Sequence, residues 1–281
     1  MFGFLSRRKV DPRAELKRVL GKYELPSFPG LVLEVLKELR AEHASARTVA
    51  RILEGDPGMS VRLLKMANSA AYGSARKTES VQQAVAVLGM SAVESLVLSI
   101  GVQTALPVTP APGFQARRFW LAAARRAAAA GAFASMLHPA TRAQSFTSSL
   151  LQDMAVPLLA NAQPRRYGPV LEEWHATGGD LPAMEVDQIG CHHPDVATWL
   201  CDQWTLPEGL AEAIGGHHGA ADLACPPAVR IVSVLRENEE ALGIDELVET
   251  ARGDYGVAPD RALHTVQESF QVAEELARLF A

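Results

Sequence analysis

The chain has 281 residues, a formal net charge of −5 and a pI near 5.9. Hydrophobic residues make up 48% and charged residues 21%, the balance of an ordinary globular protein, and the acidic excess argues against nucleic acid as a partner. The three cysteines show no CxxC spacing, which excludes a zinc ribbon or redox pair and fits a reducing cytoplasm. No uninterrupted apolar run is long enough for an integral membrane segment, so we expect a cytoplasmic protein.

The first 106 residues are predicted to form six helices, because apolar side chains recur at helical spacing between turn signals. Ser80 with Gln83 has the pattern of a capping box, and Ser91 with Glu94 repeats it. The predicted segments are Pro12–Leu20, Phe28–Arg40, Ser45–Gly55, a helix that begins at Asp56, one that begins at Ser80 and one from Ser91 to about Ala105.

A proline-rich stretch, LPVTPAPG at Leu106–Gly113, is the clearest boundary in the chain. It has the composition of a linker, but we expect a connection within one compact unit. Helix follows helix after it, with no alternating β-segment, which predicts an all-α bundle. These predicted helices are Phe114–Leu137, Thr141–Asn161 with an interruption at Pro157, Arg166–Thr177, Leu181–Ile189, Pro194–Trp204, Pro207–Gly215, Pro227–Leu242, Ile244–Gly253 and Pro259–Phe280.

The segment DPGMSVRLLKMANSAAYG, residues 56 to 73, combines a helix start with a tight exit. Asp56 is expected to cap the helix, and Pro57 takes a first-turn position where its missing N–H costs nothing. Asn68 and Ser69 end the helix, and Gly73 lets the chain turn away. We expect Asn68 to be buried with both amide groups bonded, which would fix how two helices meet. A contact to a partner or ligand is the alternative.

Together with LPSFPG at Leu25–Gly30 and SVQQAVAVLG at Ser80–Gly89, this segment resembles the HDOD domain, a bacterial signalling relative of the HD and HD-GYP phosphohydrolases. The resemblance implies an HD-like helical core preceded by an N-terminal helical subdomain. The implied organisation is an N-terminal extension (1–20), an HDOD domain (21–225) and a C-terminal helical extension (226–281) that packs on the same unit. Within the domain, the N-terminal part ends at about residue 106 and the degenerate HD-like part begins at about 113.

The metal ligands of HD hydrolases are histidines and aspartates from several helices, and the resemblance assigns a position to each. Three of these positions carry another residue. The first histidine is replaced by Ala122, the histidine of the HD pair by Gln152, and the final aspartate by Arg236. Four positions keep a possible ligand: Asp153, His193, His217 and His218.

This incomplete set predicts no catalytic residue, no bound metal and no cofactor. His217 and His218 are adjacent, and successive helical positions point about 100° apart, so both rarely meet one metal. If a metal binds, Asp153, His193 and His217 are the expected ligands, with water in the fourth position. In the simpler interpretation the paired histidines merely follow a helix end and Asp153 bonds a nearby N–H group.

Four arginines, Arg117, Arg118, Arg125 and Arg126, lie on the long helix after the proline-rich stretch. We expect a solvated helix face. A docking surface for an acidic partner or a phosphate is the alternative.

From these residues we expect a non-catalytic regulatory module in signal transduction that binds an unidentified signalling protein. Two alternatives remain open. One is a divergent metal-dependent phosphohydrolase that acts on a nucleotide or cyclic dinucleotide. The other is a metal-free nucleotide sensor, in which Arg236 or the arginines of the long helix hold a phosphate.

Overall fold

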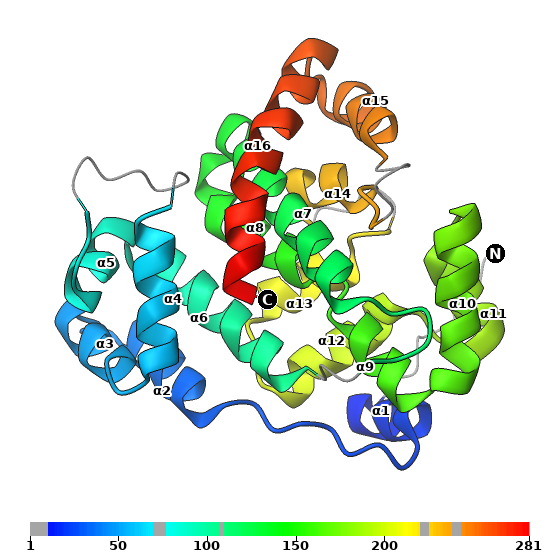
Figure 1. The fold of residues 1–281 in the computed structure, drawn as a ribbon, viewed down its shortest axis with the longest axis horizontal. Coiled ribbons are helices and arrows are strands. Elements are labelled where there is room, and N and C mark those ends of the chain that lie inside the picture. The colour runs from blue at the N-terminus through cyan, green and yellow to red at the C-terminus, as the bar shows by residue number, and fades with distance from the viewer. Residues whose placement is uncertain (1–10, 70–76, 107–109, 220–224, 238–242, 281) are drawn as a thin grey trace, which may run out of the picture.

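The computed structural model describes residues 11–69, 77–106, 110–219, 225–237 and 243–280, and these form a bundle of helices (Figure 1). Within these ranges the only β-type pairing is an isolated bridge between Ala111 and Phe114. The predicted all-α fold is therefore confirmed. Gly73 and part of the proline-rich boundary lie outside the described residues.

The helices of the N-terminal part begin close to their predicted starts. Asp56 Oδ1 accepts a hydrogen bond from the N–H of Met59 at 2.9 Å, and Pro57 is the first residue of its helix, as predicted. Ser80 caps in the same way, with 3.2 Å between its Oγ and the nitrogen of Gln83. The helices are α1 (Pro12–Leu20), α2 (Gly30–Leu39), α3 (Ala46–Leu53), α4 (Pro57–Ala67), α5 (Val81–Leu88) and α6 (Met90–Ala105). Helices α2 to α5 form one end of the molecule, while α1 lies apart from them and contacts α12 (Figure 1).

The second predicted capping box is wrong. Helix α6 begins at Met90, directly after Gly89, and no side chain caps its first turn. Gly89 adopts a φ of 77°, so α5 and α6 meet at an angle of 112° across this one residue, and Ser91 falls inside the first turn of α6. Glu94 instead forms an ion pair at 3.0 Å with Arg40, the residue that follows α2.

No single helix in the described ranges is both long and apolar enough to cross a membrane, and only the bent pair α5 and α6 passes that test together.

Asn68 joins the end of α4 to the chain that leads into α5. Its Nδ2 donates to the carbonyls of Leu64 and Thr78 at 2.8 and 2.9 Å, and its Oδ1 accepts from the N–H of Thr78 at 2.8 Å. Both amide groups are bonded as predicted, but the side chain is exposed rather than buried. The neighbouring Ser69 is the buried member of the pair, and it bonds to the carbonyl of Met66.

The second half of the chain packs around α7 (Ala116–Leu137), the long central helix of Figure 1. Helices α8, α14 and α16 contact it directly. The C-terminal half of α7 forms a second apolar core with the last three helices. The remaining helices are α8 (Arg142–Leu151), α9 (Ala155–Ala162), α10 (Pro164–Thr177), α11 (Leu181–Ile189), α12 (His193–Gln203), α13 (Glu208–Gly215), α14 (Pro227–Ser233), α15 (Ile244–Tyr255) and α16 (Pro259–Phe280), with a short 3₁₀ turn at Pro139–Thr141.

Two predicted helices are shorter in the structure. The segment 141–161 is interrupted between α8 and α9, at residues 152–154, and not at Pro157. Pro157 lies in the first turn of α9, where a proline is tolerated because its N–H would have no partner within the helix. The predicted helix Pro227–Leu242 ends at Ser233. Both interruptions lie beside the cluster described next.

Candidate functional site

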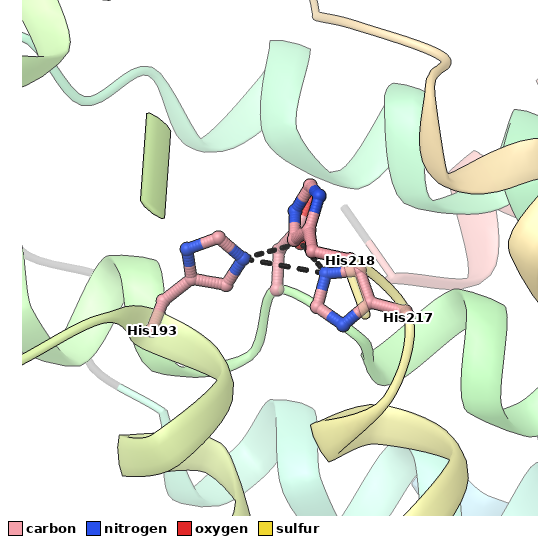
Figure 2. A group of neighbouring side chains, drawn as sticks. His193, His217 and His218 are labelled. Atoms are coloured by element: carbon pink, nitrogen blue, oxygen red, sulfur yellow. Dashed lines mark hydrogen bonds and ion pairs between the residues drawn. The ribbon is translucent and has the colours of Figure 1, made fainter. Parts of the chain in front are cut away.

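Four side chains that are far apart in the sequence face one another between the helices. Asp153 lies in the break between α8 and α9, His193 is the first residue of α12, and His217 and His218 occupy the turn after α13. Each offers one ligand atom, and these atoms all lie within 4.8 Å of one another. Figure 2 shows the imidazoles of His193 and His217 facing each other, with the imidazole of His218 beside them. The expectation that adjacent histidines diverge is wrong here, because the helix ends at Gly215 and the turn does not follow helical spacing.

The three buried ligand atoms form a nearly equilateral triangle. The Nε2 atoms of His193 and His217 are 3.3 Å apart, and Asp153 Oδ1 lies 3.4 Å from the first and 3.3 Å from the second. These separations are at the long end of the range for hydrogen bonds. A tetrahedral ion with N and O ligands at about 2.0–2.1 Å separates the ligand atoms by about 3.3–3.4 Å. The donor set therefore fits one metal ion of the zinc type.

Neighbouring groups orient both histidines of this triangle. Glu185, in α11, is fully buried. Its Oε2 atom lies 2.8 Å from Nδ1 of His193 and also accepts a hydrogen bond from the backbone N–H of His193. Its other oxygen accepts from the hydroxyl of Tyr167. His217 Nδ1 donates to the carbonyl of Ile214 at 2.5 Å. With each Nδ1 engaged, each Nε2 faces the cluster, an arrangement common around metal-binding histidines.

Arg126 lies on the inner side of α7 and is only 2% exposed. One terminal nitrogen lies 2.6 Å from Asp153 Oδ2, and the other donates to the carbonyl of Leu235 at 3.0 Å. That carbonyl is available because α14 has already ended. The predicted solvated position is wrong for Arg126, whereas Arg117 and Arg118 are exposed as expected. Sequence reasoning missed Arg126 and Glu185 as parts of this cluster.

The charges of the cluster follow from burial and from these contacts. Burial alone would raise the pKa of Asp153, but Arg126 and the bonds from His193 and His217 hold it well below its usual range. Burial alone would lower the pKa of His193, but Glu185 and Asp153 raise it to about 10. Burial lowers the pKa of His217, and Asp153 opposes this. Loss of hydration and the two neighbouring histidines lower the pKa of His218 to about 2, so its imidazole is neutral.

The substituted positions do not contribute a ligand to this cluster. Ala122 has no donor atom, and Gln152 is 1% exposed with neither amide atom hydrogen-bonded to any described residue. Arg236 follows α14 and pairs with Glu246 of α15 at 2.7 Å. A pocket of about 430 Å³ extends from the cluster to Arg236. Its lining includes Arg126, Asp153, His193, His218 and Arg236.

With the motifs and the cluster established, comparison with known families decides the relationship. The family model of the HDOD domain matches residues 25–220. The chain belongs to the HDOD family. A curated relative from Treponema pallidum (strain Nichols), named "Uncharacterized protein", is 24% identical over 202 residues. The alignment covers 69% of this chain but only 38% of that protein, so this chain corresponds to well under half of its relative.

Solved structures show the same fold. An HDOD domain protein from Geobacter sulfurreducens has a TM-score of 0.70 at 19% identity, with 96% of this chain and 98% of that one covered. A Shewanella amazonensis SB2B protein named "Putative phosphohydrolase" has a TM-score of 0.75 at 20% identity, with coverages of 95% and 98%. At these identities the likeness establishes the HDOD-type helical fold and does not transfer an activity.

Proposed function

We propose that this HDOD protein is a non-catalytic regulatory module that acts by binding another protein. The observation that carries the proposal is the loss of the histidine or aspartate at three HD-site positions, where Ala122, Gln152 and Arg236 stand. A hydrolase of this kind uses a metal to polarise a phosphate and to supply hydroxide, which requires open coordination positions and, in two-metal sites, ligands for both ions. The remaining donors converge on a single point.

The environment of Asp153 supports the same proposal. Its Oδ2 pairs with Arg126 at 2.6 Å, so only Oδ1 is directed toward the histidines. A carboxylate in this position does not bridge two metal ions. The ion pair also joins α7 to the break between α8 and α9, which gives the former HD residue a structural role.

Exposed apolar side chains on the N-terminal helices are candidates for the protein contact. Leu33 of α2 is 44% exposed, Val61 of α4 50% and Val87 of α5 42%. Each is an aliphatic side chain that a partner could cover, and each lies on a different helix of the N-terminal part. Exchange of each for lysine is expected to weaken a specific complex without unfolding the chain.

An assay of hydrolysis tests the non-catalytic part. Protein loaded in turn with Mn²⁺, Fe²⁺ and Zn²⁺ is incubated with p-nitrophenyl phosphate, its bis ester, nucleotides and cyclic dinucleotides. We expect no turnover above that of Asp153→Asn in the same buffer. Turnover by the wild type that this variant loses would overturn the proposal.

The second candidate is a phosphohydrolase with one metal ion. The specific observation in its favour is the triangle of His193, His217 and Asp153, whose edges of 3.3–3.4 Å suit a tetrahedral ion. In this alternative the residues hold the ion, which would supply Lewis acidity, and a phosphate ester would enter through the pocket lined by Arg126 and Arg236. The assay above distinguishes the two candidates.

A further inference from the structure

A second cavity, of about 470 Å³, lies between the N-terminal helices and the second half of the chain, and it shares no lining residue with the pocket beside the histidine cluster. Helices α5 and α6 line one side, and α7, α8, the short 3₁₀ turn and α16 line the other (Figure 1). Small-molecule sites typically measure about 300–1,000 Å³ and are common between the helices of bundles. The volume and the position of this cavity therefore both suit a small molecule.

We propose that this cavity binds a small amphipathic carboxylate, with its apolar body between the helices and its head group at Arg142. The proposal concerns a site separate from the histidine cluster, and it does not depend on the protein contact proposed above.

The lining of the cavity is mostly apolar. Phe146 of α8 and Val272 and Leu276 of α16 supply its larger side chains. The residues that α7 contributes, Ala128 and Ala132, are too small to fill the space. Transfer of a hydrocarbon chain from water into this space is favourable, because it removes apolar surface of both the ligand and the protein from water.

The buried serines of the lining do not require a polar ligand. Ser95 Oγ donates to the carbonyl of Ala143 at 3.3 Å, and Ser269 Oγ donates to the carbonyl of Thr265 at 2.6 Å. With both hydroxyl protons engaged, the interior favours a hydrocarbon body over a polyhydroxylated one. The bond from Ser95 also joins α6 to α8, so a ligand beside it would contact both halves of the chain.

Arg142 supplies a positive charge where the cavity meets solvent. It is the exposed first residue of α8, and none of the described residues pairs with its guanidinium. A cation at the N-terminal end of a helix is electrostatically unfavourable, and an anion bound beside it would relieve this. The planar guanidinium can hold a carboxylate through two parallel hydrogen bonds.

Glu268 of α16, which also lines the cavity, narrows the choice of anion. Its carboxylate lies 3.2 Å from Nε2 of His264, and both side chains are 69% exposed. A negative charge at the same opening disfavours a doubly charged phosphate more than a singly charged carboxylate. The expected head group is therefore a carboxylate.

Titration calorimetry with decanoate tests the site. The wild-type chain is titrated below the micelle concentration, and we expect saturable binding of one decanoate per chain. Decanol has the same chain without the charge, and it should bind about tenfold more weakly because it lacks the charge-assisted hydrogen bonds to the arginine. Decyl phosphate should also bind more weakly than decanoate.

Two substitutions separate the head of the site from its body. Arg142→Gln should weaken decanoate binding about tenfold and leave decanol binding unchanged. Ala128→Leu should abolish the binding of both, because the larger side chain fills the cavity. The matched control is Arg117→Gln, which replaces an exposed arginine of α7 outside the cavity and should change neither affinity. Circular dichroism checks that each variant is folded, and Arg142→Gln, at an exposed position, keeps the test valid if Ala128→Leu does not fold.

Three results would overturn the proposal. Absence of saturable decanoate binding by the wild type would remove the site. Equal decanoate affinity in the wild type and Arg142→Gln, or in the wild type and folded Ala128→Leu, would place binding elsewhere. Tighter binding of decyl phosphate than of decanoate would contradict the carboxylate head group.

Discussion

The guanidinium of Arg126 lies 2.6 Å from Asp153 Oδ2, and this ion pair joins the central helix α7 to the interrupted segment that carries the former HD residue. Both side chains are buried, and Arg126 extends the connection to the end of α14 through the carbonyl of Leu235. The central helix α7, the break between α8 and α9, and the chain after α14 therefore meet at the guanidinium of Arg126.

Arg126→Met should destabilise the protein strongly. The substitution keeps much of the side-chain volume but leaves the Asp153 carboxylate without its arginine, and the loss of one partner of a buried pair costs about 3–5 kcal/mol. Urea denaturation measures the change in the free energy of unfolding. The matched control is the neighbouring Arg125→Met, whose guanidinium lies 5.0 Å from the ring centre of Phe270. We expect a loss of about 1 kcal/mol there. Equal losses for the two variants would contradict the structural role of the ion pair.

The fold was largely predictable, because apolar spacing and capping residues are local signals. The start at Asp56 and Pro57 and the cap at Ser80 are examples. The ends of α8 and α14 were not predictable in the same way, because their apolar pattern continues beyond the point where the helix stops. At Leu235 the carbonyl that a longer helix would have bonded is bound instead by Arg126, 109 residues earlier in the chain.

The candidate site was predictable only in part. Asp153, His193 and His217 were assigned by their places relative to motifs, and the structure brings them together. Arg126 could not be assigned, because an arginine beside Arg125 in an alanine-rich helix has no local signal of burial. Glu185 lies eight residues before His193, and its exposure and contacts depend on the packing of α11 against α12. The convergence of His217 and His218 depends on a turn that helical spacing does not describe.

Gly101→Ala tests the packing of α6 against α2. A Cβ atom at this position would lie 2.8 Å from Phe28 Cζ and 2.8 Å from Val32 Cγ1, so the substitution overpacks the interface. We expect a loss of about 1–3 kcal/mol in the free energy of unfolding, measured by urea denaturation. Gly253→Ala in α15 is the control, because its Cβ would meet no atom within 4 Å. That variant should gain about 0.5–1 kcal/mol from helix propensity. Destabilisation of both variants to the same extent would count against the contact.

Asn68→Ala should open the connection between α4 and α5. The substitution removes two donated bonds and the acceptor for the Thr78 N–H, and we expect a loss of about 1–2 kcal/mol because the group is exposed to water. Hydrogen exchange at the Thr78 amide should become faster. Asn68→Asp keeps the acceptor and loses the donors, so it should protect this amide better than the alanine variant does. Unchanged exchange in Asn68→Ala would show that the loop is held by other contacts.

In the metal-free protein, His193 should make stability depend on pH on the alkaline side. Glu185 and Asp153 raise the pKa of His193 to about 10, compared with about 6.5 in an unfolded chain. A raised pKa gives stability that is complete below about pH 6.5 and declines as the pH rises toward 10, because the unfolded state loses its proton first. Urea midpoints measured between these limits should therefore fall with pH. Glu185→Gln removes the largest contribution that raises this pKa, so its midpoints should fall less steeply. Ionisable groups outside the cluster are the same in both proteins, so the difference between the two slopes reports the groups that Glu185 contacts, His193 and Tyr167. Parallel slopes would mean that Glu185 does not hold His193 in its protonated form.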